Sequence, residues 1–136
     1  EVYAVANGEV VYIVDPPLGD YGKQIVIKID NSQYYAFYAH LLQIDVKKGD
    51  VVKKGDTIGK TGITGNAKTF RGLDQHLHFE CRTAAKLGKG LDGRLSPNNI
   101  VLTKFYSQGP KSEIQSSLGV YKVDKNNKQT KMDCIL

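Results

Sequence analysis

The stretch Asp74-Gln-His-Leu-His-Phe-Glu-Cys-Arg82 alternates polar and apolar residues, and this alternation is what most constrains how the chain folds. A β-strand points residues i and i+2 to the same side. Read as a strand, the stretch has four polar side chains on one face and three apolar side chains on the other. The polar set is Asp74, His76, His78 and Glu80, and the apolar set is Leu77, Phe79 and Cys81. The sequence therefore predicts one chemical face and one core face.

Two of the three histidines in the chain, His76 and His78, lie in this stretch. A His-x-His pair on a strand can bind a metal ion, or can hold one imidazole on a metal and the other beside it for proton transfer. The third, His40, ends an aromatic-rich run that also reads as a strand. Alternation places it with Tyr34, Ala36 and Tyr38, opposite Tyr35, Phe37, Ala39 and Leu41. A solvated face that merely carries histidines is the alternative, and the third histidine argues against it.

The rest of the chain reads as short strands separated by turn residues, with no amphipathic helix, so the predicted class is all-β. Asn7-Gly8 between two apolar runs predicts a β-hairpin. Asp15 to Gly22 consists of turn residues and predicts a loop. A short repeat follows, Val46-Lys-Lys-Gly-Asp50 and then Val52-Lys-Lys-Gly-Asp56, in which each Gly-Asp marks a turn.

Length and composition bound the protein to one soluble globular domain. The chain has 136 residues, of which 40% are hydrophobic and 24% charged, and no apolar run approaches the roughly 20 residues that span a bilayer. A net charge of +5 suits an anionic partner, but the lysines are scattered along the chain and do not indicate which kind of anion it is. Cys81 shares a face with Leu77 and Phe79, which favours a buried thiol, and a disulfide with Cys134 is the alternative.

Four motifs in this order resemble those of the lysostaphin-type (LytM-type) zinc metallopeptidases, which are bacterial cell-wall endopeptidases. They are Tyr38-Ala-His-Leu41, the paired Lys-Lys-Gly-Asp turns, Ile58-Gly-Lys-Thr-Gly-Ile-Thr-Gly65 and His76-Leu-His-Phe-Glu80. The resemblance implies a small antiparallel β-sheet fold of the barrel-sandwich hybrid type, with a narrow groove and one zinc ion. It also implies hydrolysis of peptide bonds in peptidoglycan stem peptides or cross-bridges. We expect residues 1–104 to form this domain and residues 105–136 to form a polar C-terminal appendage.

The resemblance also implies roles for the three histidines. His78 looks like a zinc ligand, whereas His40 and His76 look like the imidazoles that flank the catalytic water, with their division of labour left open. The other two ligands in the family come from a His-x-x-x-Asp motif upstream of the strand that begins here at Val2. We expect these ligands on residues outside this chain. The alternatives are Asp74 as a substitute ligand, or a degenerate relative that binds cell wall or activates another wall hydrolase.

The resemblance further implies peptidoglycan as the partner and the bacterial cell envelope, the periplasm or the exterior as the location. An inhibitor or immunity protein would be a further partner of an antibacterial toxin. We expect no nucleic acid, because basic and aromatic residues are not interleaved on one strand face. The Val-x-x-Gly-Asp turns also occur in lipoyl and biotinyl carrier domains, but no hairpin tip offers the lysine that those domains modify.

Overall fold

The computed structural model describes residues 1–65, 77–87, 92–95, 111–116 and 119–124, the last two segments by their backbone alone. All the secondary-structure elements in this part of the chain are β-strands. The strands are β1 (Val2–Tyr3), β2 (Gly8–Leu18), β3 (Gly22–Ile29), β4 (Tyr35–Ala39), β5 (Leu41–Ile44), β6 (Val51–Val52), β7 (Thr57–Thr61), β8 (His78–Arg82), β9 (Arg94–Leu95), β10 (Lys111–Ser116) and β11 (Gly119–Asp124).

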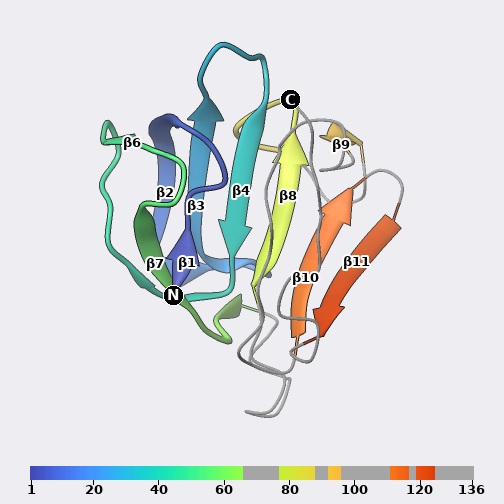
Figure 1. Cartoon of the computed structure of the whole chain (residues 1–136). Helices are drawn as coiled ribbons and strands as arrows, with labels where there is room; N and C mark the ends of the chain where they lie inside the picture. Colours follow the sequence, from blue (N-terminus) through green and yellow to red (C-terminus); the bar gives the residue numbers. More distant parts are fainter. Residues whose placement is uncertain (66–76, 88–91, 96–110, 117–118, 125–136) are drawn as a thin grey trace.

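The strands form two sheets (Figure 1). The small sheet has the order β1-β7-β5, and the large one has the order β11-β10-β8-β4-β3-β2-β6, with β9 paired to β8. Every pairing is antiparallel except that of β10 with β8. The predicted all-β, antiparallel class is confirmed.

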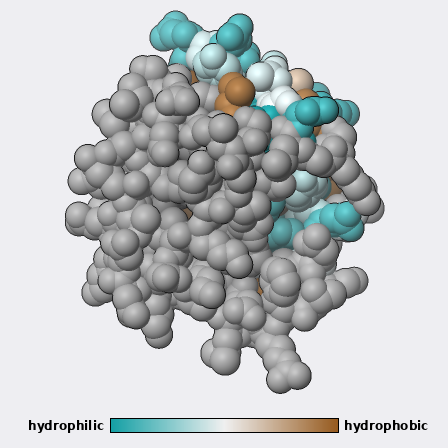
Figure 2. Space-filling model, turned by 90° about the vertical axis from the view of Figure 1, so that its right-hand side faces the viewer, coloured by the Kyte–Doolittle hydropathy of each residue, from teal (hydrophilic) through white to brown (hydrophobic). Residues whose placement is uncertain are grey.

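The main hydrophobic core draws on both sheets. It contains fully buried side chains from six strands, namely Val10, Ile27, Tyr38, Leu41, Ile58 and Phe79. Cys81 is also fully buried in this core, as expected for a small hydrophobe, while Cys134 lies outside the described residues. Figure 2 views the molecule from the side of β10 and β11, where the coloured residues range from hydrophilic to near neutral, with a few hydrophobic ones among them.

The predicted hairpin at Asn7-Gly8 is wrong, because the two strands beside it belong to different sheets. β1 pairs with β7, whereas β2 pairs with β3 and β6. Asn7 instead stabilises the connection between the two sheets. Its carbonyl accepts from the Asp30 amide at 3.0 Å, and its side chain accepts from the Lys54 amide at 2.8 Å. Gly8 is needed here for close packing, because a Cβ on it would lie 2.3 Å from the Lys28 carbonyl oxygen.

The two predicted Gly-Asp turns are confirmed, and each is closed in the same way. The Asp50 carboxylate accepts from the Lys47 amide, and the Asp56 carboxylate accepts from the Lys53 amide, both at 2.9 Å. Gly49 and the equivalent glycine of the second turn have positive φ, of 96° and 91°. This conformation explains why glycine precedes each aspartate.

The edge of β8 that faces away from β4 is covered by two short elements (Figure 1). β10 runs parallel to it opposite residues 78–80, and β9 runs antiparallel to it opposite residues 81–82. Parts of residues 105–136 thus extend the large sheet, and their status as a separate appendage stays a prediction. Among the described residues, no helix is long and apolar enough to cross a membrane.

Candidate active site

β8 has the alternation that the sequence predicts, but both of its faces are buried. Leu77, Phe79 and Cys81 pack into the main core. On the other face, His78, Glu80 and Arg82 are only 4%, 0% and 3% exposed. Polar side chains this deeply buried require partners, because an unpaired buried charge costs several kcal/mol. The polar face of β8 is therefore an enclosed site and not a solvated sheet surface.

His40 reaches this enclosed face by a break in the strand. It follows β4 with φ of 59°, and its amide donates to the Tyr21 carbonyl at 2.9 Å. Strict alternation would have placed it opposite Ala39, which is the register partner of His78. The positive φ instead brings the His40 ring centroid to 5.4 Å from that of His78, with the two rings nearly perpendicular. The predicted face of His40 was wrong, because the chain turns at that residue.

Both faces of β4 are buried. This corrects the interpretation of Tyr34 to Leu41 as one strand with a single apolar face. Ala36, Tyr38 and Leu41 belong to the main core. Phe37 and Ala39 form a second small cluster with Val26 on the side of the histidines. The bulky set expected to form the core thus divides between the two faces.

A backbone carbonyl fixes the tautomer of His40. Its Nδ1 lies 2.7 Å from the Thr64 carbonyl oxygen, and a carbonyl can only accept. Nδ1 therefore carries the hydrogen and the lone pair is on Nε2. Thr64 is itself held in place, because its hydroxyl donates to the Leu41 carbonyl at 2.8 Å and accepts from the Lys23 amide at 3.0 Å. His40 is thus oriented as a group that can accept a proton through Nε2.

A carboxylate orients His78 in the opposite sense. His78 Nε2 lies 2.8 Å from Glu80 Oε1. Burial by itself raises the pKa of Glu80, but the hydrogen bond from His78 and the charge of Arg82 outweigh it, and the pKa of Glu80 falls below its usual value. Glu80 is therefore an acceptor, so Nε2 of His78 donates, and in the neutral imidazole the lone pair is on Nδ1. A histidine oriented by a carboxylate in this way is suited to bind a metal through its other nitrogen.

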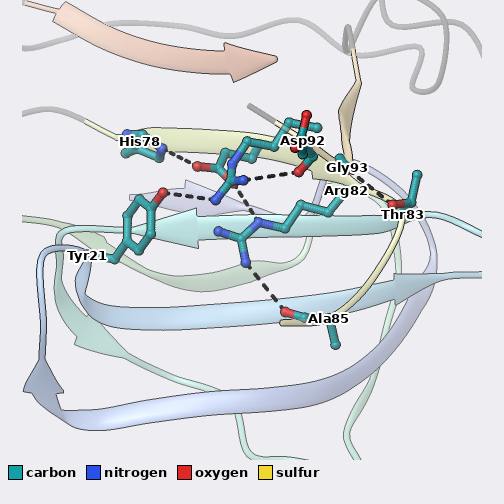
Figure 3. Close-up of polar contacts among 9 residues, drawn as sticks. Tyr21, His78, Arg82, Thr83, Ala85, Asp92 and Gly93 are labelled. Atoms are coloured by element: carbon teal, nitrogen blue, oxygen red, sulfur yellow. Dashed lines mark hydrogen bonds and ion pairs between the residues drawn. The ribbon is translucent and has the colours of Figure 1, made fainter. Parts of the chain in front are cut away.

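Two arginines hold the other oxygen of Glu80 (Figure 3). Arg82 donates from Nε to Oε2 at 2.5 Å, and Arg94 donates from Nε to the same oxygen at 2.8 Å. The Arg82 guanidinium also stacks on Phe37, 3.5 Å from its ring centroid. Arg94 is 1% exposed and comes from β9, the strand opposite Arg82. Glu80 is thus fully engaged and is a structural carboxylate rather than a base.

Tyr21, which the sequence places in a predicted loop, forms a wall of the site. Its ring centroid lies 5.3 Å from His78 and 6.5 Å from His40, and its hydroxyl accepts from Arg94 Nη2 at 3.1 Å. Burial raises the pKa of Tyr21, and the nearby Glu80 carboxylate raises it further, so the phenol stays protonated. Figure 3 shows Tyr21 and His78 on the same side of Arg82.

The predicted site residue His76 and the substitute ligand Asp74 both lie outside the described residues. Among the residues that the structure does describe, no group of three or more His, Cys, Asp or Glu side chains could hold a metal. A catalytic zinc normally takes three protein ligands. His78 fits one ligand position by its orientation, and a catalytic zinc would need further ligands from outside the described residues.

The fold and site together define a lysostaphin-type domain. The chain is similar to the catalytic domain of the antimicrobial peptidase lysostaphin from Staphylococcus simulans, with a TM-score of 0.53 and 31% identity, over 64% of this chain and 60% of that one. Residues 1–92 match the model of peptidase family M23. The chain belongs to peptidase family M23, which confirms the resemblance stated from the sequence.

Two curated relatives differ in what their names say they do. The peptidoglycan DD-endopeptidase ShyB of Vibrio cholerae is 40% identical over 79 residues, which are 58% of this chain and 17% of that protein. The murein hydrolase activator NlpD of Escherichia coli is 38% identical over 85 residues, which are 62% of this chain and 20% of that protein. The chain spans about a fifth of these two relatives, so it is similar to one domain of each.

Proposed function

We propose that this domain acts in a zinc-dependent endopeptidase that hydrolyses peptide bonds in peptidoglycan stem peptides or cross-bridges. The observation that carries the proposal is the pair of rings 5.4 Å apart, His40 and His78, oriented by different acceptors. One presents Nε2 and the other Nδ1, as expected if one handles protons and the other binds a metal. Membership of a peptidase family and similarity to lysostaphin and ShyB support this function.

In this proposal His78 is a zinc ligand through Nδ1, and His40 and His76 are catalytic. Zinc, when bound, would supply a Lewis acid that lowers the pKa of water toward about 7. His40, with its Nδ1–H directed to the Thr64 carbonyl, would accept a proton at Nε2 and later return it to the leaving amine. The other imidazole beside the catalytic water would be His76, which is assigned from the motif alone. The site of action would be the cell envelope, the periplasm or the exterior.

A second candidate is a non-catalytic domain that binds cell wall or activates another hydrolase. Two observations favour it: the similarity to the activator NlpD, and the lack of a three-ligand group among the described residues. The two candidates differ in one requirement, because only the enzyme needs two further zinc ligands beyond His78.

The test is to measure zinc content and release of soluble peptides from peptidoglycan in the full-length protein. We expect one zinc per chain. His78→Ala should lose the metal, while His40→Ala and His76→Ala should keep it and lose about 10²–10⁴-fold in rate. Tyr34→Phe, which removes an exposed hydroxyl that accepts from the Gln33 side chain, serves as the control.

Full-length protein without zinc and without activity would favour the non-catalytic candidate. Stoichiometric zinc in His78→Ala would reject His78 as a ligand. Residues 1–136 alone should bind zinc weakly, and tight binding that depends on His40 and His76 would instead indicate a three-histidine site.

A further inference from the structure

Arg82 and Arg94 lie in an arrangement that would be unfavourable without Glu80. They are register partners across the antiparallel pair of β8 and β9, so both side chains lie on the same face. Both are buried, at 3% and 1% exposed. Like charges directly opposite one another repel, and burial strengthens the repulsion. The shared carboxylate oxygen, Glu80 Oε2, accepts from both guanidiniums and offsets this repulsion.

The same arrangement leaves Glu80 no freedom to rotate. One oxygen accepts from two guanidinium Nε groups, and the other lies 2.8 Å from His78 Nε2. A swing of the carboxylate away from His78 would break charge-assisted bonds to both arginines. The orientation of the imidazole therefore depends on the two arginines that hold Glu80.

The two arginines contact their surroundings, Tyr21 included, in different ways. The Arg82 guanidinium stacks on Phe37 and also lies 5.6 Å from the centroid of the Tyr21 ring, and its Nη1 is 3.5 Å from the Ala85 carbonyl, at the limit of hydrogen-bonding distance. Arg94 instead reaches across the site, donating from Nη2 to the Tyr21 hydroxyl at 3.1 Å. The Tyr21 carbonyl accepts from the amide of His40 at 2.9 Å. Arg94 thus joins the support of His78 to the support of His40.

We infer that Arg94 is a positioning residue that fixes the orientations of the His78 and His40 imidazoles relative to each other. It acts on His78 through Glu80 and on His40 through Tyr21. The inference rests on the proposed function for its consequence in catalysis. The orientation of the two imidazoles is nevertheless a property of the described chain without metal. Arg94 lies beyond the residues that match the family model, which end at residue 92.

The geometry also explains why lysine would not replace this arginine. Arg94 uses all three nitrogens of one rigid fork: Nε toward Glu80, Nη2 toward Tyr21 and Nη1 toward the Asp92 carbonyl. A lysine ammonium is a single point charge and cannot keep all three directions. Arg94→Lys should therefore keep the charge opposite Glu80 and lose the connection between the two histidines.

The experiment is ¹⁵N NMR of the histidine rings in residues 1–136 at a pH of about 8.5, above the ordinary histidine pKa. We expect wild type to show His78 protonated on Nε2 and His40 protonated on Nδ1. Arg94→Gln and Arg94→Lys should lose the single-tautomer pattern of His78 and shift the His40 signals. Lys48→Gln, which removes an exposed positive charge in the turn that ends at Asp50, should leave both patterns unchanged.

Tyr21→Phe provides a second route if the Arg94 variants fail to fold, because it removes only the hydroxyl that Arg94 contacts. It should shift the ring signals of both histidines. Unchanged signals of both histidines in a folded Arg94 variant or in Tyr21→Phe would overturn the inference. In the full-length protein, Arg94→Lys should also lower zinc affinity or activity about 10–100-fold. If wild type has neither zinc nor activity while the NMR result holds, the proposed function fails and the positioning role stands.

Discussion

The two faces of β8 are equally buried but are held together in different ways. Leu77, Phe79 and Cys81 lie in an apolar core drawn from both sheets, where stability depends on buried area and volume. On the other face, Glu80 is held by directional bonds to two arginines and a histidine. An apolar core tolerates residues of similar size, whereas a buried charge network fails when one member is removed. The comparison indicates that the polar face, more than the apolar one, fixes a single arrangement of side chains around the site.

The largest expected effect comes from removing the charge at the centre of the polar face. Glu80→Gln leaves Arg82 and Arg94 buried opposite one another without a carboxylate, and we expect a loss of about 3–5 kcal/mol in the free energy of unfolding. The control is Phe79→Leu on the core face of the same strand, which should cost less, about 1–2 kcal/mol. Urea unfolding of both variants measures the difference. A Glu80→Gln cost no larger than that of Phe79→Leu would remove the distinction between the faces.

A close backbone approach on the histidine side gives the next largest effect. Gly22 has φ of 66°, and a Cβ there would lie 2.4 Å from the Gly65 nitrogen and 2.5 Å from the Thr64 hydroxyl oxygen. Gly22→Ala should therefore cost roughly 2–4 kcal/mol, from left-handed backbone strain plus overpacking. It should also displace the Thr64 carbonyl that orients His40, which NMR of the His40 ring would detect.

Gly49→Ala is the matched control for this substitution. Gly49 also has positive φ, of 96°, but a Cβ on it would meet nothing within 4 Å. Only the backbone strain remains, about 1–2 kcal/mol. Equal costs at the two positions, with the His40 signals unchanged in Gly22→Ala, would show that the contact with Thr64 does not constrain the site.

The apolar core also contains a buried polar group whose contribution to stability can be tested, the Tyr38 hydroxyl. The fully buried Tyr38 hydroxyl accepts from the Val5 amide at 2.9 Å, so Tyr38→Phe leaves that amide unsatisfied and should cost about 1–3 kcal/mol. Burial raises the pKa of Tyr38 above its ordinary value. The folded state therefore opposes ionisation, and its stability should fall as the pH rises above about 10.

Unfolding in urea at neutral pH and again near pH 10.5 tests both parts of this prediction. Tyr38→Phe should lose less stability than wild type over that interval. The partly buried Tyr34, whose hydroxyl accepts from the Gln33 side chain, supplies the control variant Tyr34→Phe. Parallel losses in wild type and Tyr38→Phe would place the alkaline sensitivity elsewhere in the molecule.

The sequence predicts the local parts of this site well. Alternation in the His-x-His stretch places His78 and Glu80 opposite Leu77 and Phe79, because a strand leaves little choice once its apolar face is buried. The face of His40 could not be predicted, because its positive φ depends on contacts with Tyr21 and Thr64. These residues are distant in sequence and close only in the fold.

The network around Glu80 was missed for the same reason. Arg94 lies 14 residues from Glu80 and 73 residues from Tyr21, and only the pairing of β9 with β8 brings the three together. Arg82 carried a usable signal, since it follows Glu80 at i+2 and extends the polar face of the same strand. Tyr21 offered a weaker one, as the single aromatic residue among the turn residues from 15 to 22.

The smallest expected effect concerns the strand pair that continues the sheet beyond β8. β10 bonds β8 directly, opposite His78 to Glu80, while β11 bonds only β10. Removal of Lys122 to Leu136 shortens the outer strand and keeps the direct partner of β8, so we expect a change within about 1 kcal/mol. Removal of residues 111–136 uncovers the β8 edge beside the site and should cost more. Thermal unfolding of both truncations measures the order. A large loss on the shorter truncation would show that the two strands support β8 as one unit, and that the polar face depends on them as well as on Arg94.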